Sequence, residues 1–135
     1  MPAREPAIRV LLLPKDTNAY GTIFGGVILS HVDLASAVQA NRVAAHRYVT
    51  RAMHAVEFHQ PVLVGDLVSF YAETLRVGTT SVTVRVSVEA ERAGAGGGPS
   101  VSIPVTEAEV VLVAVGPDGR PVPVRREPDP GSGTT

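Results

Sequence analysis

The sequence predicts an α+β domain in which a strongly curved antiparallel sheet wraps one long helix. Residues 27–47 contain neither Gly nor Pro and are rich in alanine, which makes them the only long helix candidate. The second half of the chain instead alternates valine with polar residues, a pattern typical of strands. Aromatic residues make up only 4% of the chain, so we expect β-branched side chains to fill the core.

The strands are expected on both sides of this helix. Residues 7–13 form an apolar opening strand that ends at Pro14 and the turn-rich residues 15–18. Four more strands follow the helix in antiparallel succession, at residues 51–59, 66–76, 81–92 and 101–115. The Gly-rich residues 93–100 are too flexible for a strand, so we expect a long hairpin loop there.

One domain is expected, over residues 7–115. It lies between an N-terminal segment (1–6) and a tail rich in Pro and Gly (116–135). A chain of 135 residues can bury a core without metal or disulfide support. The tail cannot bury enough surface to fold alone, so it is predicted to be flexible.

The predicted helix distributes its side chains unusually. At 100° per residue, Val32, Leu34 and Val38 fall in one broad apolar arc with His31, and this side is expected to face the core. The opposite side carries mostly small residues together with Asp33. The helix is therefore expected to be buried on most sides, with one narrow face touching something other than bulk water.

The composition argues against several classes of protein. The absence of cysteine excludes disulfides, thiol nucleophiles, iron–sulfur ligation and cysteine-rich zinc modules, and it fits a reducing compartment. A net charge of −1 offers no basic field for nucleic acid or an anionic membrane, so neither is an expected partner. The apolar run at residues 10–13 is too short for a membrane helix, and a cytoplasmic location is predicted.

The four histidines do not suggest a metal site. His31 falls in the core-facing arc, and His46 is expected near the helix end, where an imidazolium complements the helix dipole. His54 and His59 are five residues apart in a predicted strand, which places them on opposite faces. We predict no metal, and no Gly-x-Ser-x-Gly elbow indicates a serine nucleophile.

The strongest candidate for a functional site is the junction between the first loop and the helix. Gly25 and Gly26 allow close approach of a ligand to unpaired helix N–H groups, which is the outline of an oxyanion site. Asp33 lies in the helix interior, where a buried carboxylate is costly without a partner. A structural alternative stays open, in which Ser30 and Ser36 satisfy Asp33 and the glycines merely permit a tight turn.

A distance argument relates these two candidates. Gly25 and Asp33 are eight helical steps apart, a rise of about 12 Å, which is too far for both to act on one carbonyl group. If both act together, the helix start of one subunit must meet the carboxylate of another, as in a two-fold dimer. The motif therefore predicts a dimer.

A set of short motifs resembles a known family: Asp16-Thr17-Asn18, Gly21, Phe24-Gly25-Gly26, Asp33, Phe58, Pro61, Gly65-Asp66 and Gly78-Thr79-Thr80-Ser81. In order and spacing, residues 7–115 resemble the acyl-CoA thioesterases of the hotdog fold, particularly the YciA-like group of bacterial acyl-CoA hydrolases. In that family an antiparallel sheet wraps the long helix, two subunits pair their sheets, and the dimers often form hexamers. The resemblance thus implies a homodimer with active sites between its subunits, assembled as a trimer of dimers.

The resemblance also implies roles for individual residues. Asp33 is the expected catalytic carboxylate, as general base or nucleophile, while the N–H of Gly25 or Gly26 from the facing subunit polarises the thioester carbonyl. Asn18 and Thr22 lie in the loop that borders the pocket. Relatives commonly carry Asp or Asn where this chain has Thr22.

The family likeness assigns a contact with coenzyme A to the turn formed by Gly78, Thr79, Thr80 and Ser81. Hydroxyl and backbone N–H groups there suit phosphates or pantetheine amides. Nearby cations that suit the nucleotide phosphates are Arg51, Arg76 and Arg85. No cofactor is expected besides coenzyme A itself, which is part of the substrate and product.

The expected function is hydrolysis of an acyl-CoA thioester to a free acid and coenzyme A. Two alternatives stay open. One is a hydratase or dehydratase of the same fold, although no histidine lies in the loop before Gly25. The other is a module that binds acyl-CoA without chemistry.

Overall fold

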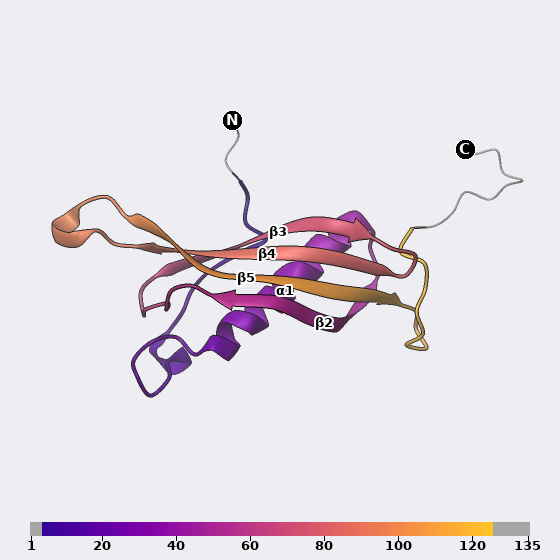
Figure 1. Cartoon of the computed structure of the whole chain (residues 1–135), viewed down its shortest axis with the longest axis horizontal. Helices are drawn as coiled ribbons and strands as arrows, with labels where there is room; N and C mark the ends of the chain where they lie inside the picture. The colour runs from indigo at the N-terminus through magenta and orange to yellow at the C-terminus, as the bar shows by residue number, and fades with distance from the viewer. Residues whose placement is uncertain (1–3, 126–135) are drawn as a thin grey trace, which may run out of the picture.

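The computed structural model describes residues 4–125 of the chain. One helix and five strands make up the fold, with short 3₁₀ turns at Pro14–Asp16 and Ala95–Gly97 (Figure 1): β1 (Ile8–Leu11), α1 (Gly25–Val43), β2 (Arg47–Phe58), β3 (Leu67–Val77), β4 (Ser81–Arg92) and β5 (Val101–Val115). The predicted order of elements is confirmed.

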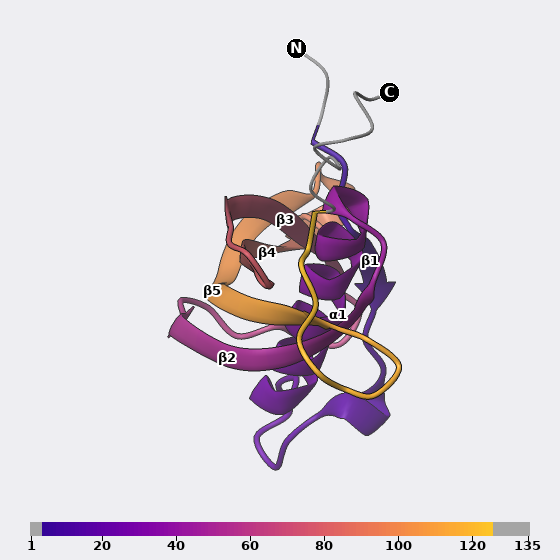
Figure 2. The same ribbon diagram turned by 90° about the vertical axis from the view of Figure 1, so that its right-hand side faces the viewer.

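The strands form one antiparallel sheet in the order β1-β3-β4-β5-β2. The sheet curves around α1, which packs against β3, β4 and β5 (Figure 2). Because β1 and β2 form the two edges, the long strand β2 has a free edge in the single chain. This architecture is the predicted α+β fold.

Valines that alternate along β4 explain which face of the sheet packs against the helix. Val82, Val84, Val86 and Val88 on β4 point to one face and are fully buried, as strand geometry requires of residues spaced by two. They meet the helix across a core built mostly from valine, in which Phe70 is the one buried phenylalanine of the described residues. The expectation of a core rich in β-branched residues is confirmed.

The helix faces the core with only part of the predicted side. Val32 is fully buried as predicted, whereas Leu34 and Val38 are 56% and 36% exposed, so their assignment to the core is wrong. The buried side carries Ile28 and Val32 together with small residues: Ala35, Ser36 and Ala40. Apolar residues occur all around this helix, and small side chains allow the sheet to approach the backbone closely, so the small-residue stripe faces inward.

The boundary between α1 and β2 also differs from the prediction. The helix ends at Val43 rather than near Arg47, and β2 begins at Arg47 rather than at Arg51. Arg47 and the next residues pair with the end of β5, where Arg47 lies opposite Val115. Hydrogen bonds to β5 therefore replace a further helical turn, and His46 lies outside the helix rather than in its last turn.

The segment after β5 is not wholly a tail. Gly116 to Arg120 form a turn with Gly119 at φ +80°, and the chain then returns along the sheet. The N–H of Val124 donates to the Thr79 carbonyl at 2.8 Å, and the Val124 side chain is 1% exposed. The prediction of a flexible tail is therefore wrong for residues 116–125, and the rest of that segment lies outside the described residues.

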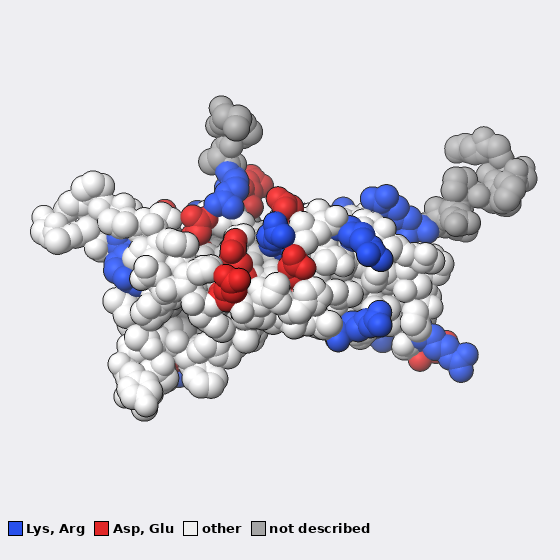
Figure 3. All heavy atoms as spheres, in the orientation of Figure 1, with Lys and Arg blue, Asp and Glu red and all other residues white. Residues whose placement is uncertain are grey.

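The outer face of the sheet carries charges of both signs side by side (Figure 3). Arg85 on β4 and His54 on β2 both contact Glu109 on the strand between them, each at 3.2 Å. Cross-strand pairs of this kind each contribute roughly 0.2–1 kcal/mol and favour the observed register. Within the described residues, no helix combines the length and the apolar character that crossing a membrane requires.

Candidate active site

Asp33 lies in the middle of α1, and its side chain is partly exposed. Its Oδ1 accepts a hydrogen bond from the Thr50 hydroxyl on β2. Its Oδ2 has no hydrogen-bond partner among residues 4–125. The carboxylate is thus oriented through one oxygen, while the other is available to accept a proton or attack a carbon atom.

The two nearby serines do not satisfy this carboxylate. The Ser30 hydroxyl donates to the Val27 carbonyl at 2.7 Å, and the Ser36 hydroxyl donates to the backbone carbonyl of Asp33 at 2.6 Å. Each serine thus bonds to its own helix three residues earlier. The alternative in which Ser30 and Ser36 hold the Asp33 side chain is wrong, because the partner is Thr50.

The helix begins at Gly25 without a side-chain cap and without an acidic residue in its first turn. Phe24 precedes it in an extended conformation. Among the hydrogen bonds of the described residues, none uses the N–H groups of Gly25 and Gly26. These donors lie at the positive end of a 19-residue helix, so the arrangement suits a negatively charged oxygen.

The two glycines differ in what surrounds them. A Cβ atom at Gly26 would lie 2.7 Å from the Phe24 ring, whereas one at Gly25 would lie 3.5 Å from the Phe58 ring. The first distance is a collision and the second is an ordinary contact. A larger residue at Gly26 would therefore make the Phe24 ring, which is 57% exposed, turn away, whereas one at Gly25 fits without a shift.

Asn18 and Thr22 lie together in the loop before the helix. The Asn18 side-chain amide donates to the Thr22 hydroxyl at 2.8 Å. The Asn18 Oδ1 accepts the N–H groups of Tyr20, at 2.8 Å, and of Thr22, at 3.2 Å. Asn18 thus shapes this loop through its own side chain, and a direct part for either residue in chemistry stays a prediction.

The single chain does not bring Asp33 to the helix start, because both belong to the same straight element, with a rise of about 12 Å between them. Large apolar side chains are exposed around both places: Phe24 is 57% exposed, Leu34 on the helix 56% and Phe58 at the end of β2 52%. Exposed apolar surface of this kind marks a contact region.

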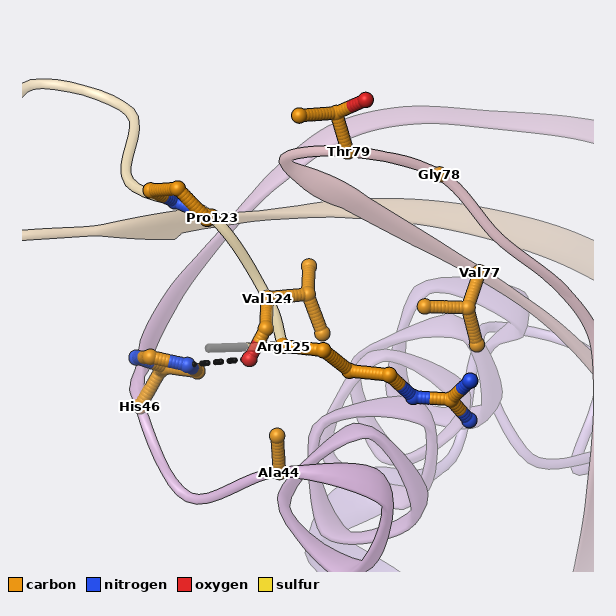
Figure 4. Close-up of a pocket in the computed structure, with 8 residues that line it drawn as sticks. All are labelled: Ala44, His46, Val77, Gly78, Thr79, Pro123, Val124 and Arg125. Carbon is orange, nitrogen blue, oxygen red and sulfur yellow. Dashed lines mark hydrogen bonds between the residues drawn. The ribbon is translucent and has the colours of Figure 1, made fainter. Parts of the chain in front are cut away.

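The turn between β3 and β4 contributes to an open groove at the other end of α1 (Figure 4). Gly78 and Thr79 line the groove, whereas Thr80 and Ser81 do not. The carbonyls of Thr80 and Ser81 accept the N–H groups of Ala114, at 2.9 Å, and of Gly78, at 2.8 Å, so these residues hold the turn itself. A contact of all four residues with coenzyme A stays a prediction.

Arg125 is a groove residue that the sequence analysis missed. Figure 4 shows its side chain beside Val77, while the Val124 carbonyl contacts the His46 ring at 2.6 Å. Of the arginines expected to contact the phosphates of coenzyme A, Arg85 forms an ion pair with Glu109. The signal in the sequence that could have indicated it is the pair Arg125-Arg126, two adjacent basic residues in the Pro-rich segment that was expected to be a tail.

His31 and His59 make contacts that do not involve Asp33. The His31 ring stacks on Phe70 at 5.5 Å, and its Nδ1 lies 2.8 Å from the Val27 carbonyl. His59 lies just after β2, 3.9 Å from Glu57 and 3.6 Å from Glu107, and all three side chains are exposed. These three ligand groups lie within 4.8 Å of one another. The absence of a bound metal stays a prediction.

Comparison with known proteins gives one family and a consistent set of relatives. The family model described as the thioesterase superfamily matches residues 20–95. A Zymomonas mobilis protein described as an uncharacterized acyl-CoA thioester hydrolase is 47% identical over 83 residues, covering 62% of this chain and 56% of the relative. The Escherichia coli acyl-CoA thioester hydrolase YciA is 42% identical over 84 residues, covering 62% and 64%. The chain thus spans less than two thirds of either relative.

Solved structures resemble nearly the whole chain. A hexameric hotdog-fold thioesterase of Campylobacter jejuni has a TM-score of 0.86 and 42% identity over 90% of both chains. A hexameric thioesterase from Yersinia pestis has a TM-score of 0.83 and 35% identity, covering 93% of this chain and 99% of the other. The predicted hotdog fold is confirmed.

Proposed function

Because the chain belongs to the thioesterase superfamily, we propose that it hydrolyses an acyl-CoA thioester to a free carboxylic acid and coenzyme A. The observation that carries the proposal is Asp33. Its carboxylate lies at mid-helix, held through one oxygen by Thr50 and bordered by exposed apolar surface. A purely structural carboxylate has no need of a free oxygen beside such a surface.

The reaction needs a water molecule and one proton acceptor. With Asp33 as general base, its Oδ2 takes a proton as the water oxygen bonds to the thioester carbon. The C–S bond then breaks, and coenzyme A leaves as a thiol once its sulfur receives that proton. With Asp33 as nucleophile, the same oxygen bonds to the thioester carbon, the C–S bond breaks and coenzyme A leaves as a thiolate. Water then cleaves the resulting mixed anhydride to the free acid and the Asp33 carboxylate, and releases the proton that converts the thiolate to the thiol. The Thr50 hydrogen bond orients the carboxylate in either case.

The developing negative charge on the carbonyl oxygen needs donors that Asp33 does not supply. The free N–H groups of Gly25 and Gly26 meet this need if they come from a second copy of the chain. The free edge of β2 and the exposed side chains of Phe24 and Phe58 offer the surface for such a pairing. We place the site between the subunits of a dimer, and the hexameric relatives support a trimer of dimers.

Coenzyme A fits along the helix toward the groove of Figure 4. Asp33 and Ala44 are eleven residues apart, a rise of about 16 Å if the helical spacing continues to Ala44. That span suits the extended pantetheine arm between a thioester at Asp33 and phosphates near Thr79 and Arg125. No other cofactor is needed for this reaction. The cytoplasmic location stays a prediction.

The test is thiol release from a panel of acyl-CoA substrates, acetyl to palmitoyl, followed with a thiol-reactive dye. The chain has no cysteine, so the enzyme itself gives no background. Asp33→Asn should lower kcat by about 10²–10⁴-fold. The matched control, Asp118→Asn in the turn after β5, should keep the wild-type rate, because that carboxylate is exposed and far along the chain.

Two outcomes would overturn the proposal. Binding of acyl-CoA without thiol release would indicate a binding module. Consumption of enoyl-CoA by addition of water, with the thioester intact, would indicate a hydratase. Neither outcome resembles a simple loss of folded protein, which thermal melting of the variants would reveal.

A further inference from the structure

Asp66 is the one buried charged residue in the described part of the chain, with 3% of its surface exposed. It lies just before β3, and Arg92 at the end of β4 pairs with it through both carboxylate oxygens. The Arg92 Nε donates to Oδ1 at 3.0 Å, and its Nη2 donates to Oδ2 at 2.7 Å. Such a two-point contact fixes direction as well as distance.

This pair also closes a turn. The Leu63 N–H donates to the Asp66 Oδ2 at 2.9 Å, and the Asp66 N–H donates back to the Leu63 carbonyl at 3.1 Å. The Arg92 Nη2 also donates to the Pro61 carbonyl at 3.2 Å. Gly65, at φ +94°, supplies the left-handed backbone that the turn requires. One carboxylate and one guanidinium therefore hold residues 61–66 at both ends.

The same turn holds the segment in front of α1. The Ile23 N–H donates to the Val62 carbonyl at 2.8 Å, and Thr22 pairs with Leu63 as an isolated antiparallel bridge. The helix begins only two residues after Ile23, at Gly25. The Phe24 N–H between them is held as well, by the Asp16 carbonyl at 2.8 Å, so residues 61–66 help to fix the backbone that leads to the first N–H groups of the helix.

We propose that Asp66 and Arg92 are positioning residues, which set the place and direction of the Gly25 and Gly26 N–H groups toward the thioester oxygen. The inference rests on the proposed function. A buried ion pair is weak evidence for added stability, since its desolvation cost can cancel its attraction. What the pair supplies is geometry, passed through Val62 and Ile23 to the helix start.

The test uses the full chain with Asp66→Asn and Arg92→Lys, and measures kcat, KM and binding of a non-hydrolysable thioether analogue of the substrate. Both variants should lower kcat by about ten-fold or more, because small displacements of catalytic groups are costly. KM and analogue affinity should stay within about three-fold, since the N–H contacts strengthen in the transition state. Urea unfolding gives the folded fraction of each variant.

Glu89→Gln is the matched control. Glu89 lies three residues before Arg92 on β4 and pairs with Arg4 and Ser102, away from residues 61–66. This variant should keep the wild-type kcat. If Asp66→Asn does not fold, Arg92→Lys decides, because lysine keeps the charge and loses the two-point contact.

A folded Arg92→Lys protein with wild-type kcat would overturn the inference, as would a fall in kcat that only matches the unfolded fraction. If the wild-type protein releases no thiol, the proposed function fails, and amide hydrogen exchange then tests the pair by itself. Faster exchange in Arg92→Lys at Leu63 and Ile23, whose N–H groups are hydrogen-bonded in the turn and just before the helix, supports the inference, and unchanged exchange there overturns it.

Discussion

The two ends of α1 differ in whether their backbone polar groups have hydrogen-bond partners. At the C-terminal end two backbone carbonyls are paired: the Ala44 N–H donates to the Ala40 carbonyl at 3.1 Å, and the Tyr48 hydroxyl donates to the Ala44 carbonyl at 2.7 Å. At the N-terminal end the Gly25 and Gly26 N–H groups have no partner among the described residues. The first N–H groups of a helix have no partner within the helix, so an end left open in this way can donate to an anionic ligand.

The open end is nevertheless held firmly from outside. The Phe24 N–H donates to the Asp16 carbonyl and the Ile23 N–H to the Val62 carbonyl, both at 2.8 Å. The backbone is thus fixed just before the donors that stay free. Fixed donors that need no reorganisation are what stabilise a developing charge most effectively. We therefore propose that one end of the helix supports the fold and that the other takes part in the chemistry.

The largest expected effect comes from the two adjacent glycines at the open end. Gly26→Ala should lower kcat by about 10²-fold, because its Cβ meets the Phe24 ring at 2.7 Å and the exposed ring must turn away, which changes the surface beside the free N–H donors. Gly25→Ala should have a much smaller effect, since its Cβ meets the Phe58 ring at 3.5 Å. Thiol-release kinetics of both variants measure this. Equal losses would mean that the two positions are not distinguished by packing.

Local pattern accounts for what the sequence predicted well. Strand β4 follows from valines spaced by two, and the place of Gly25, Gly26 and Asp33 at the start and middle of one helix follows from a Gly-Gly pair before an alanine-rich run. These features depend on neighbours within a few residues, so a single sequence carries them. The same reasoning placed the helix end four residues too late, because pairing with β5 competes with helix propensity there.

Long-range contacts account for what the sequence did not show. Thr50 reaches Asp33 across 17 positions, and Arg92 reaches Asp66 across 26. The burial of Val124 likewise depends on its hydrogen bond to Thr79, and no local pattern in a Pro-rich segment indicates that contact. Such partners are fixed by topology, which composition and periodicity do not reveal.

The next effect concerns the C-terminal end of α1, where Pro123, Val124 and Arg125 line the groove. Val124→Ala should lower the free energy of unfolding by about 2 kcal/mol, because it truncates a fully buried side chain. The kcat per folded protein should change little, because the groove lies at the other end of α1 from Gly25 and Gly26, and a weaker contact with coenzyme A there would raise KM instead. Urea unfolding measures the change. Val101→Ala at the exposed start of β5 is the control, and a similar loss there would argue against a specific role for the segment.

Lowering the pH should destabilise the backbone at the N-terminal end of α1 before that at its C-terminal end. Burial raises the pKa of the Asp66 carboxyl, but hydrogen bonds from Arg92 and Leu63 outweigh it and hold the pKa below its usual value. Its contribution to stability is therefore complete above about pH 4 and is lost as the pH falls through the lowered pKa. The Leu63 N–H bond breaks with it.

Hydrogen exchange measured from pH 6 down to pH 3 tests this order. After correction for the intrinsic pH dependence, protection at Leu63 and Ile23 should fall before protection at Ala44. Asp66→Asn should remove most of this pH dependence of the open end. A simultaneous loss of protection at both ends would show that acid unfolds the whole domain rather than the N-terminal end of α1 first.

The smallest expected effect tests the satisfied carbonyl at the C-terminal end of α1. Tyr48→Phe removes one hydroxyl that donates to Ala44, so it should lower the free energy of unfolding by about 1 kcal/mol. Burial raises the pKa of the Tyr48 hydroxyl, which therefore keeps its proton and donates at neutral pH. Tyr20→Phe is the control, because the Tyr20 side chain is 92% exposed and should cost almost nothing. If the two variants unfold at the same urea concentration, the Tyr48 hydrogen bond adds no stability at the C-terminal end of α1. The two helix ends would then differ only in the free N–H donors at Gly25 and Gly26.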